Sequence, residues 1–235
     1  MKVAVMQPYF FPYIGYFQLI HCVDKFVVFD DVNFIKKGWI NRNRILVNGA
    51  PFMFSIPLKQ MSQNKWIRDT ELSDDLTWTS KFLKTLESAY KKAPQFNQIF
   101  PAVERLLQEE HPSIASLNTA SLRFVCDYLG LDTTLVPSSA AYANSDLKGQ
   151  YRILDICRKE GADTYINPIG GTELYDQARF EENGIQLYFL QSDASPYRQF
   201  GHDFFPYLSM LDCLMFADKA EIKQKLSEFQ LITSV

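Results

Sequence analysis

The chain opens with short apolar runs separated by a stretch of helical periodicity. Residues 2–6 form a run of Val and Ala that ends at Gln7-Pro8, because proline removes a backbone donor from a sheet ladder. Residues 25–29 return to a β-branched and aromatic run, and the apolar positions between them follow helical spacing. This pattern predicts a strand, a loop, a helix and a second strand, which is the beginning of a βαβ unit.

The middle of the chain carries a hairpin signal and three helical patterns. Residues 44–47 and 52–54 flank Asn48-Gly49, a pair that readily supplies the positive φ angles of a type I′ turn. Beyond it, apolar residues recur at three- and four-residue spacing in segments punctuated by Pro94 and Pro112. We therefore expect a β-hairpin followed by helices over residues 78–91, 95–110 and 113–129.

The last third alternates between strand and helix patterns, which favours parallel strands joined by crossover helices. Strands are predicted over 134–137, 163–167 and 185–191, with helices over 150–160, 174–182, 208–216 and 219–229, and Asp218 as a helix cap. The sequence thus predicts one α/β domain over residues 1–235. It combines a mainly parallel sheet and its crossover helices with a β-hairpin insertion and a helical middle segment.

Composition narrows the classes of protein that this chain could be. Hydrophobic residues make up 47% and charged residues 22%, enough to bury a core without disulfides or metals. The net charge is −3 and basic residues are interleaved with acids, so no nucleic-acid partner is expected. No apolar run reaches membrane-spanning length and no signal region forms before Pro8, so the expected location is the cytoplasm.

The four cysteines give no sign of a metal site or a disulfide framework. They stand far apart, with no CxxC pair and no histidine at metal-ligand spacing, in largely apolar stretches: Cys22, Cys126, Cys157 and Cys213. Reduced thiols in the core are the expected state, and no metal site is predicted from them.

A dense aromatic string follows the first predicted strand, at the place where open α/β sheets bind ligands. It reads Gln-Pro-Tyr-Phe-Phe-Pro-Tyr-Ile-Gly-Tyr-Phe-Gln over residues 7–18. The prolines restrict its backbone, and Gly15 allows the helix to approach a neighbour closely. Rings that merely seal the core are the alternative, but we expect Gln7, Tyr9, Tyr13 and Gly15 to contribute to a substrate pocket.

This string resembles the amino-terminal signature of the WbqC-like family, found in bacterial gene clusters for surface polysaccharides. The likeness continues through residues 30–34, 38–43, 56–58, 78, 90–94, 138–139, 161–165, 170–171, 175 and 208–212. It implies a role in O-antigen or capsule biosynthesis rather than a particular reaction. The string is also similar in position to the ATP-contacting loop of nucleotidylyltransferases and pantothenate-synthetase-like ligases, but the histidines of that signature are missing.

A second group of chemistry-bearing residues follows the second predicted strand. Asp30 and Asp31 are candidates for acid and base catalysis, with Asp31 as a base or as a ligand of Mg²⁺. Nearby cations and polar side chains could hold a phosphate or carboxylate, and the candidates are Lys37, Trp39, Asn41 and Arg42. The structural alternative is a capped turn followed by solvated lysines.

A third group follows later strands. Gly170-Gly171 stands between a strand and a helix, where backbone amides can bind an anion, with Thr172 as a cap or phosphate donor. Asn167 and Tyr175 flank this turn, and an ordinary strand-to-helix turn is the alternative. Ser138 and Ser139 follow another strand, where capping is their expected role and a phosphate cradle the alternative.

Histidine adds one further candidate. His202 lies beside an aspartate in an aromatic loop and is a candidate acid or base, whereas no Ser-His-Asp arrangement is recognisable. The cofactor stays open, with Mg²⁺ bound together with a nucleotide as the candidate.

Three functional hypotheses follow. The first is a transferase acting on a nucleotide-activated sugar or other phosphate-bearing precursor of surface polysaccharide, including group transfer to an amino sugar. The alternatives are a non-catalytic module that binds a glycan precursor or a partner protein, and an ATP-dependent nucleotidylyl transferase or ligase. The expected ligand is a nucleotide or nucleotide-sugar, and a homodimer is left open.

Overall fold

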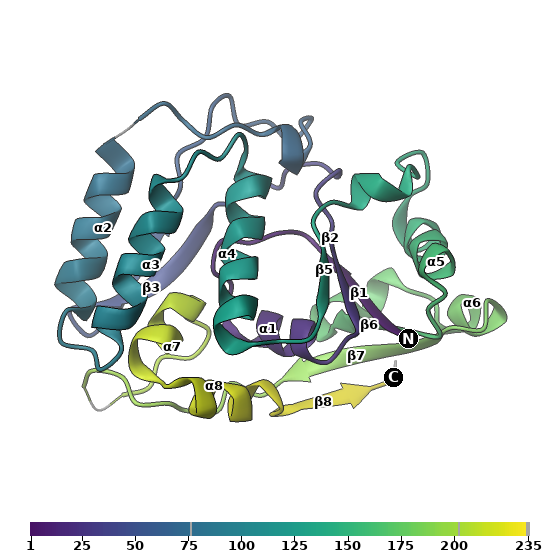
Figure 1. The fold of residues 1–235 in the computed structure, drawn as a ribbon. Helices are drawn as coiled ribbons and strands as arrows, with labels where there is room; N and C mark the ends of the chain where they lie inside the picture. Colours follow the sequence, from purple (N-terminus) through teal and green to yellow (C-terminus); the bar gives the residue numbers. More distant parts are fainter. Residues whose placement is uncertain (76, 202, 234–235) are drawn as a thin grey trace.

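The computed structural model describes residues 1–75, 77–201 and 203–233, and its centre is a six-stranded sheet (Figure 1). The strand order is β5-β2-β1-β6-β7-β8; the first five strands are parallel and β8 is antiparallel to β7. These strands are β1 (Lys2–Met6), β2 (Lys25–Val28), β5 (Thr134–Val136), β6 (Thr164–Pro168), β7 (Gln186–Ser192) and β8 (Phe229–Ile232). The expected α/β fold with a mainly parallel sheet is confirmed.

Both faces of the sheet are buried, which explains its continuous apolar runs. Alternate side chains of β1 and β2 point to opposite faces: Ala4 and Phe26 join one core, while Val3, Val5 and Val27 join the other. The first core also takes side chains from most of the helices, whereas the second is closed by α5 (Gly149–Glu160) and α6 (Gln177–Glu182). Figure 1 shows these two helices together on one side of the sheet.

The helical middle segment forms as its periodicity predicts. Its helices are α2 (Thr77–Tyr90), α3 (Phe96–Gln108) and α4 (Ile114–Leu129), and they stand beside one another away from α5 and α6 (Figure 1). Ser113 caps α4 by accepting a hydrogen bond from the Ser116 amide, and Gly130 ends the helix in the left-handed conformation. Helix α1 (Ile14–His21) packs with α4 in the first core.

The predicted hairpin is confirmed as a separate two-stranded sheet of β3 (Arg42–Val47) and β4 (Ala50–Ser55). Asn48 and Gly49 have φ angles of 51° and 77°, as a type I′ turn requires. The register pairs Val47 with Ala50 directly across this turn. The turn dipeptide therefore sets the pairing of the whole hairpin.

Two predicted helices were wrong in part. The helix expected over 174–182 is divided: a 3-10 helix, η3 (Ile169–Leu174), precedes α6, whose start is capped by Asp176. The helix expected over 219–229 ends as α8 (Lys219–Leu226), and the chain then forms β8, because pairing with the edge of β7 satisfies its backbone groups. Helix α7 (Met210–Phe216) and the Asp218 cap of α8 form as expected.

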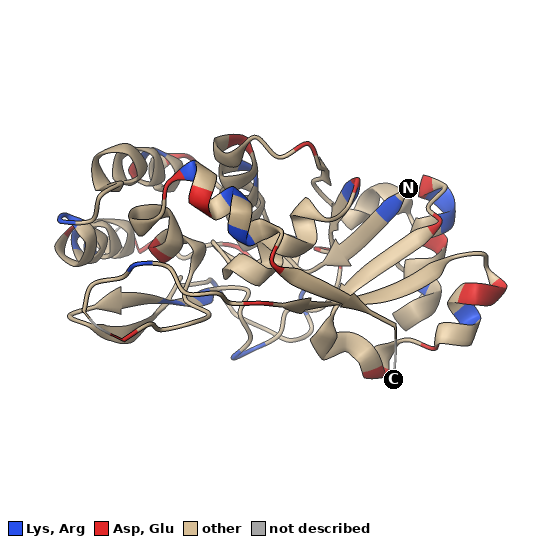
Figure 2. Ribbon diagram, turned by 90° about the horizontal axis from the view of Figure 1, so that it is seen from below, with Lys and Arg blue, Asp and Glu red and all other residues tan. Residues whose placement is uncertain are grey.

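Charged residues of both signs are interspersed over the helices and loops (Figure 2). None of the helices described combines the length and the apolar run that crossing a bilayer requires.

Candidate functional site

The carboxyl ends of the parallel strands gather several predicted site residues at one edge of the sheet. Asp30 and Asp31 follow β2, while Ser138 and Ser139 follow β5, the strand that pairs with β2. Ser138 donates a hydrogen bond from Oγ to Asp30 Oδ1 at 2.7 Å, and the Ser139 amide donates to the same oxygen at 3.2 Å. The structure thus joins two groups that lie more than a hundred residues apart in the sequence.

Asp30 has the electrostatic character of an acid or base. Burial raises the pKa of its carboxyl above the ordinary value, and the negative charge of Asp31 adds to the rise, while hydrogen bonds from Ser138 and Ser139 oppose it. Asp30 Oδ1 accepts both of the hydrogen bonds described above, so Asp30 Oδ2 is available to other groups. The residue is only 5% exposed, yet it lines a large recess in the protein surface.

Asp31 lies in a different environment from its neighbour. Its carboxylate is paired with Arg152 of α5, with Nη2 2.5 Å from Oδ1, and it also accepts a hydrogen bond from the Ser139 hydroxyl. The side chains of Asp31 and Arg152 are 3% and 4% exposed. Asp31, which the sequence favoured as base or Mg²⁺ ligand, is therefore already paired with a buried cation. Of the two carboxylates, that of Asp30 is more available to a ligand.

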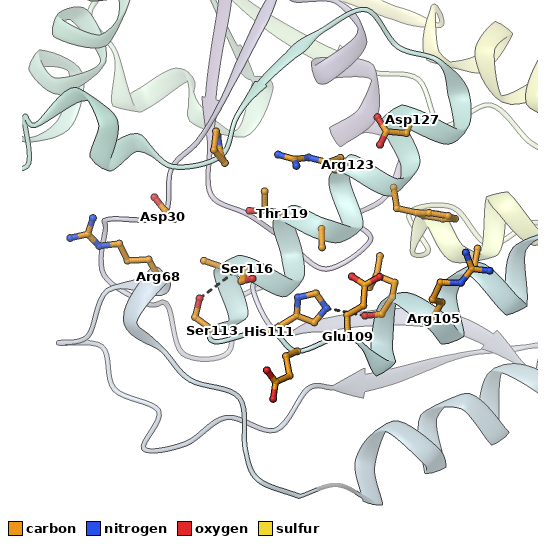
Figure 3. A pocket seen from close by; sticks show the side chains of 17 residues that line it. Asp30, Arg68, Arg105, Glu109, His111, Ser113, Ser116, Thr119, Arg123 and Asp127 are labelled. Atoms are coloured by element: carbon orange, nitrogen blue, oxygen red, sulfur yellow. Dashed lines mark hydrogen bonds between the residues drawn. The ribbon is translucent and has the colours of Figure 1, made fainter.

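The recess beside Asp30 has a volume of about 760 Å³ and lies between the ends of β2 and β5, helix α3 and helix α4 (Figure 3). The first turn and one face of α4 form much of its wall, with hydroxyl groups from Ser113, Ser116 and Thr119. In Figure 3, Thr119 lies between Asp30 and Arg123. The volume is within the range of small-molecule pockets.

Three arginines line this recess, which we call the Asp30 pocket: Arg68, Arg105 and Arg123. Arg68 lies 3.8 Å from the Asp69 carboxylate and its guanidinium is over the Trp66 ring. Within the described ranges, Arg105 and Arg123 have no carboxylate oxygen within 4 Å, so their charges are available to an anion. The start of α4 adds the positive end of a helix dipole.

Acidic residues and one histidine complete the Asp30 pocket. Glu109, Glu110 and Asp127 are exposed residues on its lining. His111 Nε2 lies 2.9 Å from the Leu106 carbonyl oxygen, so Nε2 carries a proton and donates it to that oxygen. Because the lining mixes charges of both signs, it suits a ligand that carries phosphate together with neutral or basic groups.

The aromatic string builds a second, smaller recess of about 170 Å³, which we call the aromatic pocket. It is lined by Tyr9, Pro12, Tyr13, Trp39, Asn43, Arg44 and Tyr207. Burial raises the pKa of Tyr9 to about 12, and burial also raises the pKa of Tyr13. Three of the predicted binding residues, Tyr9, Tyr13 and Trp39, therefore lie here rather than beside Asp30.

Other predicted residues of the 37–42 segment are engaged with the backbone. Arg42 donates from Nε to the Gly38 carbonyl at 2.9 Å and from Nη2 to the Lys37 carbonyl. Asn41 is buried and donates to the Ile56 carbonyl at 2.8 Å. Lys37 is exposed, with a φ of 61°. The guanidinium of Arg42 thus shapes this loop.

The chain adds strands β2 and β5 on one side of β1 and strands β6, β7 and β8 on the other, so the strand order reverses between β1 and β6. Gln7 and Asn167 lie beyond the residues that pair these two strands. Only Lys2–Thr164 and Val3–Tyr165 pair across these two strands, so they part towards their carboxyl ends. Asn167 Oδ1 accepts from the Tyr165 hydroxyl at 3.2 Å. A Cβ on Gly171 would overlap the Asn167 amide nitrogen, so Gly171 is needed for close packing under that side chain.

The remaining predicted residues are distributed around these features. The Gln7 carbonyl accepts from the Tyr16 hydroxyl at 2.7 Å. Gly15 lets α1 approach closely, as expected, because a Cβ there would lie 2.5 Å from Ser192 Oγ. Tyr175 packs on Tyr165, while Gly170 and Thr172 lie in η3, and His202 falls outside the described residues.

Sequence reasoning missed most of the Asp30 pocket. Arg68, Arg105, His111 and Arg123 carry no motif, and they come together only because η1 (Ile67–Asp69), α3 and α4 pack near the end of β2. Apart from Phe124, the face of α4 that lines the pocket carries small, polar or charged residues, and this pattern is a signal that could have indicated the pocket. Among the described residues, no group of three or more His, Cys, Asp or Glu side chains is placed to hold a metal ion.

Comparison with known proteins shows the family of this chain. The family model of the WbqC-like proteins matches residues 7–224. The uncharacterized protein Rv1507c of Mycobacterium tuberculosis (strain ATCC 25618 / H37Rv) is 32% identical over 216 residues, covering 91% of this chain and 92% of that protein. No solved structure gave a significant match. The chain belongs to the WbqC-like protein family.

Proposed function

We propose that this protein is a transferase that acts on a nucleotide-activated sugar or another phosphate-bearing precursor of bacterial surface polysaccharide, with its reacting centre in the Asp30 pocket. The observation that carries this proposal is the placement of one buried carboxyl, at the end of a parallel strand, in the same recess as three arginines. Carboxyl ends of strands are the usual ligand-binding edge of such sheets.

Arg105 and Arg123 would hold the phosphates of the donor. Both are exposed and have no ion-pair partner in the part of the chain that is described, so binding a phosphate would not break an existing salt bridge. A guanidinium can donate two parallel hydrogen bonds to phosphate oxygens. The hydroxyls of Ser116 and Thr119 on α4 would add donors near the start of the helix.

Asp30 would act as the general base towards the acceptor. A hydroxyl or amine of the acceptor attacks the activated carbon of the donor and forms the new bond, while the bond from that carbon to the phosphate oxygen breaks. The acceptor proton passes to Asp30, and the phosphate leaves with the electron pair, stabilised by the arginines. A carboxylate whose pKa is raised is a stronger base, which suits this role.

Asp31 and Arg152 would support the site from behind. The Ser139 amide and hydroxyl bridge the two aspartates, and the Asp31–Arg152 pair fixes the position of this turn. If the donor is bound with Mg²⁺, Asp30 is the carboxylate available to meet it, because that of Asp31 is already paired with Arg152.

The first experiment is a thermal-shift screen of the protein against nucleotides and nucleotide-sugars, with and without Mg²⁺. A ligand at one hundred times its dissociation constant stabilises by ~2.7 kcal/mol, which corresponds to a rise in Tm of roughly 5 °C or more for a chain of this size. Arg105→Gln and Arg123→Gln should lose that rise. Arg158→Gln is the matched control, since Arg158 lies on α5 and donates to Asn183.

Asp30→Asn separates binding from chemistry. It keeps an oxygen that accepts from Ser138 but removes the base. We therefore expect the Tm rise measured without Mg²⁺ to be retained, and turnover with the acceptor to fall by about a hundredfold or more. No shift with any phosphate-bearing ligand, or an unchanged shift in both arginine variants, would refute the proposal.

A further inference from the structure

The aromatic pocket is a site separate from the Asp30 pocket and shares none of its lining residues. Its walls come from three segments: the loop after β1, the segment before β3 with β3 itself, and the segment before α7. The rings of Tyr13 and Tyr207 meet edge to face with centroids 5.8 Å apart. A volume of about 170 Å³ is below that of pockets for drug-sized ligands and suits a single ring.

The backbone that forms this pocket is strained and firmly held. Phe11 and Tyr207 have φ angles of 39° and 57°, a region that costs a non-glycine residue energy. The Phe11 carbonyl accepts hydrogen bonds from Asn43 Nδ2 and Ser209 Oγ, each at 2.7 Å, and its amide donates to Ser121 Oγ at 3.1 Å. A loop fixed by so many hydrogen bonds presents its rings in one arrangement before any ligand binds.

Arg44 gives the pocket an uncompensated positive charge. Its guanidinium lies 5.6 Å from the centre of the Trp39 ring, and its Nε is buried without a hydrogen-bond partner. Nη2 makes only a long contact of 3.4 Å with the Tyr207 carbonyl. The lining contains no carboxylate, and within the described residues Arg44 has no ion pair. A ligand with a carboxylate would supply the missing partner.

The phenol groups point to a ligand with hydroxyls. In the part of the chain that is described, neither the Tyr9 nor the Tyr13 hydroxyl donates to or accepts from another protein group. Burial raises the pKa of both, to about 12 for Tyr9, so at neutral pH they are protonated donors. A pyranose offers C–H faces to aromatic rings of the lining and hydroxyls at its edge that can pair with phenols.

We propose that the aromatic pocket binds a single pyranose ring that carries a carboxylate, a uronic acid residue, with its face on the aromatic rings and its carboxylate on Arg44. This site does not depend on the reaction proposed for the Asp30 pocket. It gives a ligand of stated chemistry, an acidic saccharide, to residues that the sequence predicted only to contribute to a substrate pocket.

The test is titration calorimetry of the whole protein with methyl glucuronide, using methyl glucoside and benzoate as comparison ligands. We expect methyl glucuronide to bind at least about tenfold more tightly than methyl glucoside, because of these two sugars only the uronide has a carboxylate that can pair with Arg44. Arg44→Gln should remove that difference. Arg179→Gln should not, although its guanidinium lies over the Tyr151 ring at the similar distance of 5.5 Å.

Trp39→Ala provides a second variant that keeps the fold, since this side chain is 43% exposed. It should weaken methyl glucuronide binding by about tenfold, through the loss of a stacking face. Equal affinities for the uronide and the glucoside, benzoate binding in preference to the uronide, or no binding of the uronide would overturn the proposal. Arg123→Gln should leave uronide binding unchanged, so failure of the uronide site is distinguishable from failure of the transferase proposal.

Discussion

The buried pair of Asp31 and Arg152 gives the sharpest prediction about stability. In Arg152→Met the side chain keeps much of its volume, but Asp31 loses the Nη2 contact of 2.5 Å, and its backbone carbonyl loses the Nη1 donor at 3.2 Å. Asn144 Oδ1 also loses its donor, Arg152 Nε, at 2.9 Å. Both charged side chains are at most 4% exposed, so water cannot replace these partners without opening the turn.

The expected loss is about 3–5 kcal/mol, the range for removing one partner of a buried ion pair, because the other charge is left uncompensated. Equilibrium denaturation with urea, monitored by circular dichroism, measures it as a fall in the free energy of unfolding. Lys159→Met is the control: Lys159 pairs with Asp155 at 2.8 Å, but its side chain is 45% exposed, so a loss below about 1 kcal/mol is expected.

The double variant with Asp31→Asn and Arg152→Met tests the reason for the loss. It leaves no unpaired charge, so it should recover part of the stability that Arg152→Met alone removes. If Arg152→Met costs no more than Lys159→Met, or if the double variant is no more stable than the single one, the pair does not act as a buried ionic contact.

Two further predictions concern close packing and pH. Gly15→Ala should lower the free energy of unfolding by about 1–3 kcal/mol, because a Cβ there would approach a neighbouring side-chain atom to 2.4 Å. Gly170→Ala is the control, since nothing lies within 4 Å of a Cβ at that position, and it should have a much smaller effect. Urea denaturation of both variants measures the difference. Asp212 is fully buried and accepts hydrogen bonds from the hydroxyls of Tyr90 and Tyr197, each at 2.7 Å; burial raises its pKa above 3.8. Since the folded state then holds the proton more tightly than the unfolded state, this carboxyl should lower stability as pH rises from 3.8 through its folded pKa. Asp212→Asn should lack that fall, and parallel pH slopes for the two proteins between about pH 4 and pH 7 would contradict the assignment.

The sequence alone determined much of the fold because its signals are local. Alternating strand and helix patterns predicted a mainly parallel sheet, and Asn48-Gly49 predicted the type I′ turn of the hairpin, which the φ angles of both residues confirm. Periodicity predicted α2, α3 and α4, because each helix needs one continuous apolar face. The predicted helix over 219–229 runs too far because residues 229–232 pair with the edge of β7 and form a strand, so tertiary pairing outweighs local propensity there.

Only the tertiary structure decided how the candidate residues are divided. Asp30 and Asp31 are neighbours in sequence, but Asp30 lines a pocket while Asp31 is paired with Arg152, 121 positions away. The arginines of the Asp30 pocket belong to elements that packing alone brings together. Strand and helix signals depend on residues that are close in the sequence, so they could be predicted from it. The sites depend on contacts between residues far apart in the sequence, and local periodicity carries no information on such contacts.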